Sequence, residues 1–419
     1  MQLKTILNRI AKQPGFVFHT VQLVVAASGS LSILVHLREH GRSRPICSRC
    51  MRKRPGYDRQ SERRFEFVPL WNIPVWFTYA PRRVKCPHCG VVVEAMPWAA
   101  GKSPITTTYA WFLASWAKVL SWTETARRFR TSWHVVFDSV RHAVEWGKAH
   151  RNLEGITAIG VDELAWKKGH KYLTVVYQVD RGCRRLLWIG RDRTAATFER
   201  FFDWLGKERT VALDFVVSDM WKAFLGVVAQ RANAAIHVLD RFHVMKLCNE
   251  AIDEVRRAEA RKLREAGDTV TLKHSRWVFL KRRTNLKNKQ RGRLRELLAA
   301  NLATVRAYLL KEDLHHFWTY KSTPHAARYL DAWLWDAIRS RLEPMMKFAR
   351  TLIEHRELLL NWFQARGELA LGAVEGMNNK ARVTTKLAYG FRSYDHAEIA
   401  LFHRLGALPE PDWLAHRFT

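Results

Sequence analysis

Three acidic residues occupy positions where carboxylates could bind a metal ion. Asp162 follows a short apolar run at residues 156–161, and Asp219 follows a second apolar run at residues 211–218. Both runs are rich in β-branched residues, which is typical of buried strands. If the two strands are neighbours, the carboxylates converge where the backbone is fixed and one side is open. For Asp162 the alternative is a plain turn aspartate.

The third acid, Glu375, begins a polar stripe on a predicted helix over residues 372–390. Helical spacing places Asn378, Asn379 and Arg382 within two turns of Glu375 on the same face. A carboxylate followed by amides and a cation suits a surface that touches a metal ion and a phosphate backbone. We therefore assign Asn378, Asn379, Lys380 and Arg382 to DNA contacts, with an ordinary amphipathic surface helix as the alternative.

Two CxxC pairs predict a structural zinc site. They comprise Cys47, Cys50, Cys86 and Cys89, with 35 residues between the pairs. Each pair forms a tight turn that directs two thiolates to one point, and two such turns complete a tetrahedral Zn²⁺ site. Because four thiolates close the coordination sphere, we expect a structural rather than a catalytic ion. Free buried thiols are the alternative.

Composition points to a nucleic-acid partner. The 419 residues include 70 Lys and Arg against 39 Asp and Glu, which gives a formal charge of +31. An excess of this size indicates a polyanion. No apolar run approaches the 18 residues that span a bilayer, and His19, Gln22 and His36 interrupt the run at residues 16–37. We therefore expect a cytoplasmic protein without membrane association, which joins the nucleoid when bound to DNA.

Two further segments are candidates for DNA contact. Residues 121–136 fit a helix-turn-helix, with Thr123 capping the first helix and Arg130 where such turns often have glycine. The second helix would present Ser132, Trp133 and His134 to DNA. A plain helical hairpin is the alternative.

The other candidate segment is residues 281–295, which carry eight basic residues and no acid. The choice is between a solvated face and phosphate contact. We favour phosphate contact, assigned to Lys281, Arg282, Arg283 and Lys287.

The order of predicted elements indicates a multidomain α+β chain. Residues 65–79 contain strand-like runs of a small β-rich module. Residues 155–245 read as three strands, a helix, a strand, a helix and a strand, which predicts a mixed sheet with helices on its faces. Helical patterns follow at residues 251–266, 293–310, 326–348 and 351–364.

Taken together, these motifs resemble those of bacterial insertion-sequence transposases of the DDE type, in the ISL-three family. The resemblance covers residues 47–406 and is specific in combination. The matching stretches are 160–163 (Gly-Val-Asp-Glu), 169–174 (Gly-His-Lys-Tyr-Leu-Thr), 218–220 (Ser-Asp-Met), 239–244 (Leu-Asp-Arg-Phe-His-Val), 374–380 (Val-Glu-Gly-Met-Asn-Asn-Lys) and 388–391 (Ala-Tyr-Gly-Phe).

The resemblance implies a catalytic triad of Asp162, Asp219 and Glu375 that binds two Mg²⁺ or Mn²⁺ ions for in-line displacement at phosphorus. Asp162 would bridge both ions. Asp240 and His243 would support these ligands from behind. Glu163, Asp180 and Asp240 are rival acids that we rank lower, because Glu163 should face the other side of the strand, Asp180 starts a turn, and Asp240 is assigned to the supporting position with His243.

The resemblance also implies a domain order. A zinc module (1–100) and a helix-turn-helix domain (101–150) precede a ribonuclease-H-like catalytic domain (151–245), which is interrupted by a helical insertion (246–370) and completed by residues 371–419. The protein would bind the terminal inverted repeats of its element and target DNA as a homodimer or larger homo-oligomer. Two other readings are a nuclease on the same fold that cuts without strand joining, and a DNA-binding regulator.

Overall fold

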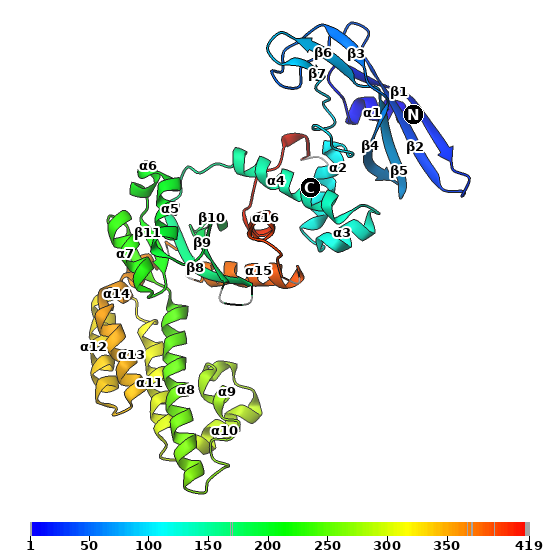
Figure 1. Cartoon of the computed structure of the whole chain (residues 1–419). Coiled ribbons are helices and arrows are strands. Elements are labelled where there is room, and N and C mark those ends of the chain that lie inside the picture. The colour runs from blue at the N-terminus through cyan, green and yellow to red at the C-terminus, as the bar shows by residue number, and fades with distance from the viewer. Residues whose placement is uncertain are drawn as a thin grey trace. The chain divides into compact units, whose positions relative to one another are not determined.

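The computed structural model describes residues 2–414, apart from residues 168, 170, 367, 370, 371 and 389 (Figure 1). The protein is a mixed α/β chain of two compact units. The first contains Met1–Arg151 and Leu408–Thr419, and the second contains Asn152–Ala407. None of the described helices has the length and apolar character needed to cross a membrane.

The first unit begins with a four-stranded sheet in the order β1-β2-β5-β4. Its pairs are antiparallel except β2 with β5. Its aromatic core includes Phe18, Phe65 and Phe77. Helix α1 (Leu3–Ile10) packs on β1. The strands are β1 (Phe16–Val25), β2 (Leu31–Glu39), β4 (Arg63–Leu70) and β5 (Ile73–Tyr79).

A smaller sheet carries the cysteines. It has the order β3-β6-β7, with both pairs antiparallel. Cys86 ends β6, and Cys47 pairs with Glu94 in an isolated bridge just after β7. The strands are β3 (Gly56–Arg59), β6 (Arg82–Cys86) and β7 (Gly90–Val93).

Three helices complete the first unit: α2 (Thr107–Ala117), α3 (Trp122–Arg128) and α4 (Trp133–His150). A capping box of Ser121 and Glu124 begins α3, so the cap is Ser121 and not Thr123 as the sequence suggested. Thr123 lies inside the first turn. Between α3 and α4, Arg130 adopts a left-handed backbone with φ of 52°, the conformation that glycine usually supplies.

The chain returns to the first unit at its C-terminal end. A Cβ on Gly147 of α4 would lie 2.7 Å from the Cβ of Leu408, so the backbones approach too closely for a side chain. Glu410 forms an ion pair with Lys118. A short 3-10 helix, η2 (Asp412–Leu414), follows, and Leu414 is buried.

The second unit is built on a five-stranded sheet in the order β10-β9-β8-β11-β12. The pairs β10–β9 and β9–β8 are antiparallel, whereas β8–β11 and β11–β12 are parallel. The strands are β8 (Ala158–Lys167), β9 (Lys171–Gln178), β10 (Arg185–Arg191), β11 (Phe215–Ser218) and β12 (Ile236–Leu239).

Different helices cover the two faces of this sheet. Ile159 and Val161 of β8 pack in one cluster with residues of α5 (Ala195–Leu205) and α7 (Lys222–Arg231). Because side chains alternate along a strand, Gly160 and Asp162 face the other side. There α15 (Ala373–Leu387) packs on β8, and α16 (Tyr394–Leu405) packs on β10. A five-residue helix, α6 (Lys207–Val211), precedes β11.

Helices fill the chain between β12 and α15. Helix α8 contacts α9, α11 and α13, and α14 contacts β12. The predicted helix at residues 326–348 is two helices, because Pro344 begins a new one. The elements are α8 (Arg241–Glu265), α9 (Arg276–Leu280), η1 (Arg283–Asn285), α10 (Asn288–Leu298), α11 (Ala303–Phe317), α12 (Thr323–Arg339), α13 (Glu343–Glu354) and α14 (Arg356–Ala365).

Candidate active site and metal centre

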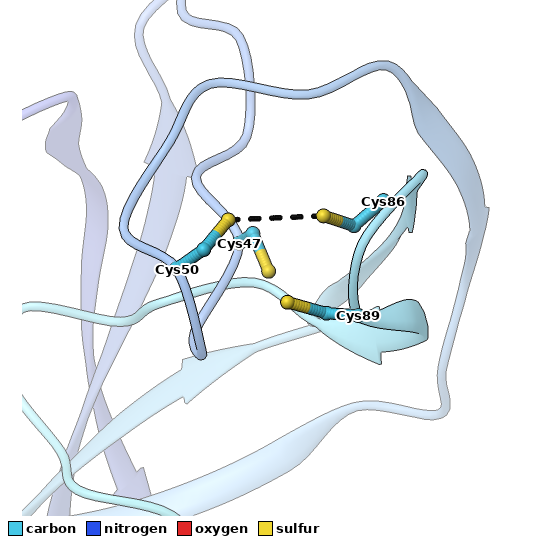
Figure 2. Close-up of side chains that lie close together, drawn as sticks. All are labelled: Cys47, Cys50, Cys86 and Cys89. Carbon is cyan, nitrogen blue, oxygen red and sulfur yellow. Dashed lines mark hydrogen bonds between the residues drawn. The ribbon is translucent and has the colours of Figure 1, made fainter.

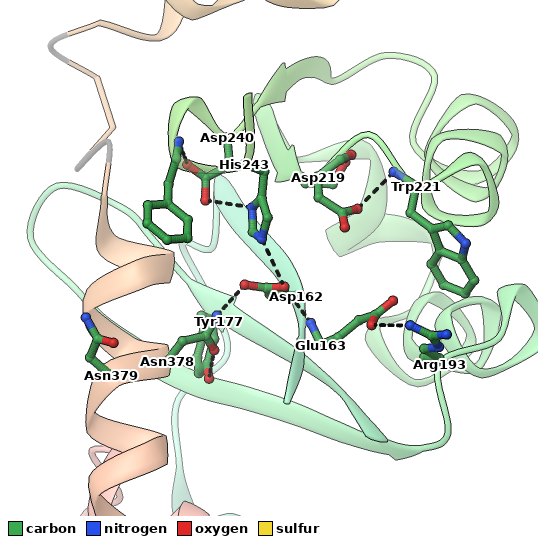
Figure 3. A network of polar contacts seen from close by, with 12 residues as sticks. Asp162, Glu163, Tyr177, Arg193, Asp219, Trp221, Asp240, His243, Asn378 and Asn379 are labelled. Carbon is green, nitrogen blue, oxygen red and sulfur yellow. Dashed lines mark hydrogen bonds and ion pairs between the residues drawn. The ribbon is translucent and has the colours of Figure 1, made fainter. Parts of the chain in front are cut away.

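Three neighbouring strands bring three aspartates to one region of the second unit (Figure 3). Strand β11 pairs in parallel with β8 on one side and with β12 on the other. When both registers are continued past the end of β11, Asp219 falls between Asp162 and Asp240. The crevice beyond the carboxyl ends of parallel strands is where α/β sheets commonly bind ligands.

The sequence predicted Asp162 just after the end of a strand, but it lies inside β8. The strand continues to Lys167 as one arm of the β8–β9 hairpin. Its side chain is buried. The backbone N–H of Glu163 donates to Oδ1 at 2.7 Å, and the side-chain amide of Asn378 donates to Oδ2. Burial raises the pKa of Asp162 to about 6, although nearby His243 opposes the shift.

His243, in the first turn of α8, lies between two of the aspartates. Its Nε2 is 3.8 Å from Oδ1 of Asp162, and its Nδ1 is 3.3 Å from Oδ2 of Asp240. Asp240 caps α8, because its Oδ1 accepts the backbone N–H of Phe242 at 2.9 Å. Burial disfavours the imidazolium, but the Asp240 contact and the charge of Asp162 outweigh it and raise the pKa of His243.

Asp219 follows β11 and is half-buried. Its Oδ1 accepts the backbone N–H of Trp221 at 3.1 Å. Burial raises the pKa of Asp219, while this hydrogen bond and the charge of His243 lower it. The carboxylate is thus fixed by the turn that leads into α7.

Glu375 stands in the first turn of α15 and is half-buried. It borders a cavity of about 280 Å³ that Asp240 also lines, with apolar walls from Phe242, Trp362 and Val374. In the described part of the chain Glu375 makes neither a hydrogen bond nor an ion pair. Its carboxylate is therefore free of the contacts that fix Asp162 and Asp219.

The acids share this region without forming a tight cluster. Among the described residues, the four cysteines are the only group of three or more His, Cys, Asp or Glu side chains whose ligand atoms all lie within 4.8 Å of one another. That Asp162, Asp219 and Glu375 meet within metal-bridging reach stays a prediction. The backbone and amide hydrogen bonds described above hold the two aspartates individually.

Two of the rival acids, Glu163 and Asp180, form contacts away from the proposed metal ligands. Glu163 points away from Asp162 along the strand and accepts from Arg193 at 3.0 Å (Figure 3). Asp180 accepts from the backbone N–H and hydroxyl of Thr157 at 3.2 and 2.6 Å. Both side chains therefore have structural partners outside the row of aspartates formed by Asp162, Asp219 and Asp240.

The polar stripe of α15 divides between the core and the surface. Asn378, predicted to contact DNA, is 2% exposed and turned toward the sheet, so that prediction is corrected. The hydroxyl of Tyr177 donates to its Oδ1 at 2.8 Å. Asn379, Lys380 and Arg382 are exposed, and Arg382 donates to Oδ1 of Asn379 at 3.1 Å.

The start of α4 carries the other predicted DNA contacts. Ser132 is the N-cap, and its hydroxyl oxygen accepts the backbone N–H of Val135 at 3.2 Å. Trp133 stacks on Phe137, with ring centroids 5.3 Å apart, so most of its surface serves packing. His134 is exposed. Ser132 is exposed as well, whereas Trp133 is half-buried.

A buried lysine holds the basic segment in place. Lys311 of α11 is 1% exposed, and its ammonium group donates to the carbonyl oxygens of Phe279 and, at 3.2 Å, Lys281. The segment that follows leaves Arg282, Arg283 and Lys287 exposed, whereas Lys281 is half-buried. Sequence pattern alone gave no signal that an internal cation anchors this surface.

The four cysteines of the two CxxC pairs face one another (Figure 2). Sγ of Cys50 and Sγ of Cys86 are 3.7 Å apart. Backbone N–H groups of Cys50 and Arg49 lower the pKa of Cys47 against the effect of burial, which favours a thiolate. The donor set and its closure fit a tetrahedral thiophilic ion such as Zn²⁺.

Sequence reasoning missed the contacts of Tyr177. It lies in a run rich in β-branched and aromatic residues, a pattern that indicates a strand but does not show that the hydroxyl of Tyr177 reaches α15. Two residues of the matching stretches, His170 and Tyr389, lie outside the described residues.

Comparison with known proteins identifies the chain. A family model described as "Transposase", for DDE enzymes of the ISL-three group, matches residues 159–401. The transposase for insertion sequence element IS1557 of Mycobacterium tuberculosis is 30% identical over 373 residues, which cover 83% of this chain and 82% of the relative. The transposase for IS1001 of Bordetella parapertussis is 30% identical over 355 residues, covering 84% and 86%. The chain belongs to the ISL-three family of insertion-sequence transposases, DNA-cleaving and strand-transferring enzymes of the DDE type.

Proposed function

We propose that this transposase cleaves and joins DNA with Asp162, Asp219 and Glu375 in a ribonuclease-H-like catalytic domain. The row of aspartates carries the proposal, because β8 and β11 present Asp162 and Asp219 on adjacent strands while α15, which bears Glu375, packs on β8. The sheet order of three antiparallel strands followed by two parallel ones supports the domain assignment. Helices α8–α14 form the insertion before the last acid.

The donor set fits two Mg²⁺ or Mn²⁺ ions, because hard divalent cations prefer carboxylate oxygens. Oδ2 of Asp240 is buried, with Nδ1 of His243 at 3.3 Å as its neighbour, and in the described part of the chain the Glu375 carboxylate makes neither a hydrogen bond nor an ion pair. When bound, such ions activate the attacking oxygen and stabilise the leaving oxygen. Asp162, Asp219 and Glu375 would hold the ions, with Asp162 and Asp219 placed by the sheet. His243 favours the ionised form of Asp162, and Asp240 supports His243 through their contact, although the charge of Asp240 itself raises the pKa of Asp162.

For DNA recognition, we propose that the zinc module and the helix-turn-helix bind the element's terminal inverted repeats. The second helix of the helix-turn-helix would contact DNA through Ser132, Trp133 and His134. The basic segment and the exposed side chains of Asn379, Lys380 and Arg382 would contact phosphates, and two ends would be held by a homodimer or larger assembly. Replacing Lys281, Arg282, Arg283 and Lys287 with Gln should reduce the slope of log affinity against log salt by about 0.9 per lost phosphate contact. An unchanged slope would show that this surface is only solvated. The matched control replaces four basic residues on and around α6 and α7: Lys207, Arg209, Lys222 and Arg231.

For the cysteine site we propose one structural Zn²⁺ per chain. Elemental analysis of purified protein should find stoichiometric zinc, and the double variant Cys47→Ser with Cys86→Ser should lose it. Cys183 and Cys248 stand outside the site, so Cys183→Ser should retain full zinc content.

The triad is tested by single alanine substitutions. Asp162→Ala, Asp219→Ala and Glu375→Ala should each abolish cleavage and joining but leave binding to the element's ends intact, since the ions act on the transition state. The losses should be non-additive because each disables one shared site. Glu163→Ala and Asp180→Ala should retain substantial activity. Cleavage without joined products would instead indicate a nuclease, and unaltered function in Asp162→Ala would indicate a regulator.

A further inference from the structure

We propose that Tyr177 and Asn378 are positioning residues for the Asp162 carboxylate, and that close packing of Val374 on Gly160 sets the placement of α15 and its Glu375. The inference rests on the proposed triad. It adds four residues that neither bind ions nor touch DNA (Gly160, Tyr177, Val374 and Asn378), and it gives Asn378 a role different from the one its sequence motif suggested.

A directed chain of hydrogen bonds runs from the sheet through α15 and back to the sheet. The hydroxyl of Tyr177 donates to Oδ1 of Asn378, and the amide nitrogen of Asn378 donates to Oδ2 of Asp162 (Figure 3). All three residues are at most 7% exposed. Burial, and then the charge of Asp162, raise the pKa of Tyr177, so its hydroxyl remains a donor. An ionised carboxylate only accepts, which fixes the amide orientation.

This series of hydrogen bonds holds the Asp162 carboxylate in one orientation. Oδ2 is held by Asn378, and Oδ1 is held by the backbone N–H of Glu163. The carboxylate plane is therefore pinned from two sides, while each oxygen keeps a lone pair. Hydrogen bonds behind a metal ligand commonly contribute 10- to 100-fold to metal affinity.

Gly160 allows the helix to lie close enough for these bonds. A Cβ at Gly160 would be 2.3 Å from Cγ2 of Val374. Tyr177 lies directly opposite Gly160 in the β8–β9 ladder. From Val374 to Asn378 the helix rises by about 6 Å, and from Gly160 to Asp162 the strand advances by about 6.6 Å. Because these two lengths are nearly equal, the contact of Val374 with Gly160 and the hydrogen bond of Asn378 to Asp162 can form at the same time.

Glu375 is the next residue after Val374, so the same packing fixes the start of its side chain. A helix displaced from Gly160 would withdraw Glu375 from the site and pull Asn378 from Asp162. The two placements are coupled through a single rigid element.

The first experiment removes the hydrogen bonds in full-length, zinc-loaded protein. Tyr177→Phe and Asn378→Ala should each weaken Mn²⁺ binding, measured by titration calorimetry, by about tenfold. The Mg²⁺ concentration for half-maximal cleavage should rise by a similar factor, with end binding unchanged. The matched control is Tyr394→Phe, which loses a comparable hydrogen bond, to the carbonyl of Ile189, and should leave both values unchanged. If Tyr177→Phe and Asn378→Ala had the same Mn²⁺ affinity and the same half-maximal Mg²⁺ concentration as Tyr394→Phe, the positioning role of the Tyr177–Asn378–Asp162 hydrogen bonds would be overturned.

The second experiment tests the packing by rescue. Gly160→Ala should weaken Mn²⁺ binding at least tenfold and reduce cleavage, and adding Val374→Ala should restore most of both, because the clashing methyl is gone. With the single Val374→Ala variant as reference, failure of the pair to recover would overturn the packing argument.

The Asp162→Ala variant distinguishes a failure of the positioning role from a failure of the proposed triad. If that variant still cleaves and binds Mn²⁺, the proposed triad fails. If it loses both while Tyr177→Phe and Asn378→Ala behave like Tyr394→Phe, the triad stands and the positioning role is wrong.

Discussion

At the residue scale, Arg54 is placed to affect the cysteine site. Its guanidinium is partly buried, with Nε and Nη2 shielded and lacking a well-formed hydrogen bond in the described part of the chain. Burial opposes its charge, but Cys50 and Cys86 outweigh this and raise the pKa of Arg54. Four thiolates around the proposed Zn²⁺ would carry an excess of two negative charges, and a neighbouring guanidinium would offset one of them.

We therefore predict that Arg54→Met lowers zinc affinity about tenfold, the lower end of losses seen when groups behind a metal ligand are removed. Competition with a chromophoric chelator measures this. Arg54→Lys should recover part of the loss, and the exposed neighbour Arg52→Met serves as control. Equal zinc retention in Arg54→Met and Arg52→Met would contradict the assignment.

Arg130 presents a different case, because its backbone has the left-handed φ of 52° while its side chain is exposed. A non-glycine residue in this conformation costs about 1–2 kcal/mol, part of which glycine loses again through chain entropy. Arg130→Gly should raise the free energy of unfolding by about 0.5–1 kcal/mol and weaken DNA binding. Arg130→Ala should weaken binding equally without the gain. Denaturant unfolding and a binding titration check both, and undiminished affinity would show that the arginine makes no phosphate contact.

At the element scale, the sequence located most strands of the second unit but not all of their bounds. The run at residues 211–218 was predicted as one strand, yet Val211 ends α6 and β11 begins at Phe215. Apolar runs do not distinguish a short helix from a strand. The sequence grouped Asn378 with Glu375, Asn379 and Arg382 on one face, but a single sequence could not reveal that Asn378 turns toward the sheet and that Val374 packs on a glycine of β8. Such contacts join residues more than 200 positions apart.

The β11–β12 pair predicts a pH dependence of stability. His237 of β12 is 9% exposed, and its Nε2 lies 2.7 Å from the hydroxyl of Ser218. Burial lowers the pKa of His237 to about 4, whereas the unfolded chain titrates near 6.5. The neutral form is therefore favoured by folding. Its stabilisation is complete above pH 6.5 and is lost as the pH falls toward 4, by up to roughly 3 kcal/mol.

Denaturant unfolding between pH 7 and 4.5 should show this loss, and His237→Gln should flatten that part of the profile. The exposed His134→Gln is the control and should leave the slope intact. An identical slope in His237→Gln would show that other groups govern the acid response.

At the scale of the whole molecule, the chain completes its first unit with its last described residues. Leu408 packs against Gly147, and Glu410 pairs with Lys118. We predict that a chain ending at Ala407 unfolds its first unit several degrees earlier, because contacts of α2 and α4 are lost. Scanning calorimetry should show the second unit unchanged. Gly147→Val in the full chain should have a similar effect by blocking Leu408, and unaltered melting in both would contradict a structural role for the return segment.

The return segment also has a consequence during protein synthesis. At bacterial translation rates of about 5–20 residues per second, roughly a quarter of a minute to a minute separates emergence of Arg151 from that of Leu408. The first unit therefore remains unfinished on the ribosome until the second unit has been made. A nascent or prematurely terminated chain lacks the closing contacts of the unit proposed to recognise the element's ends. Only finished molecules would compete for those ends.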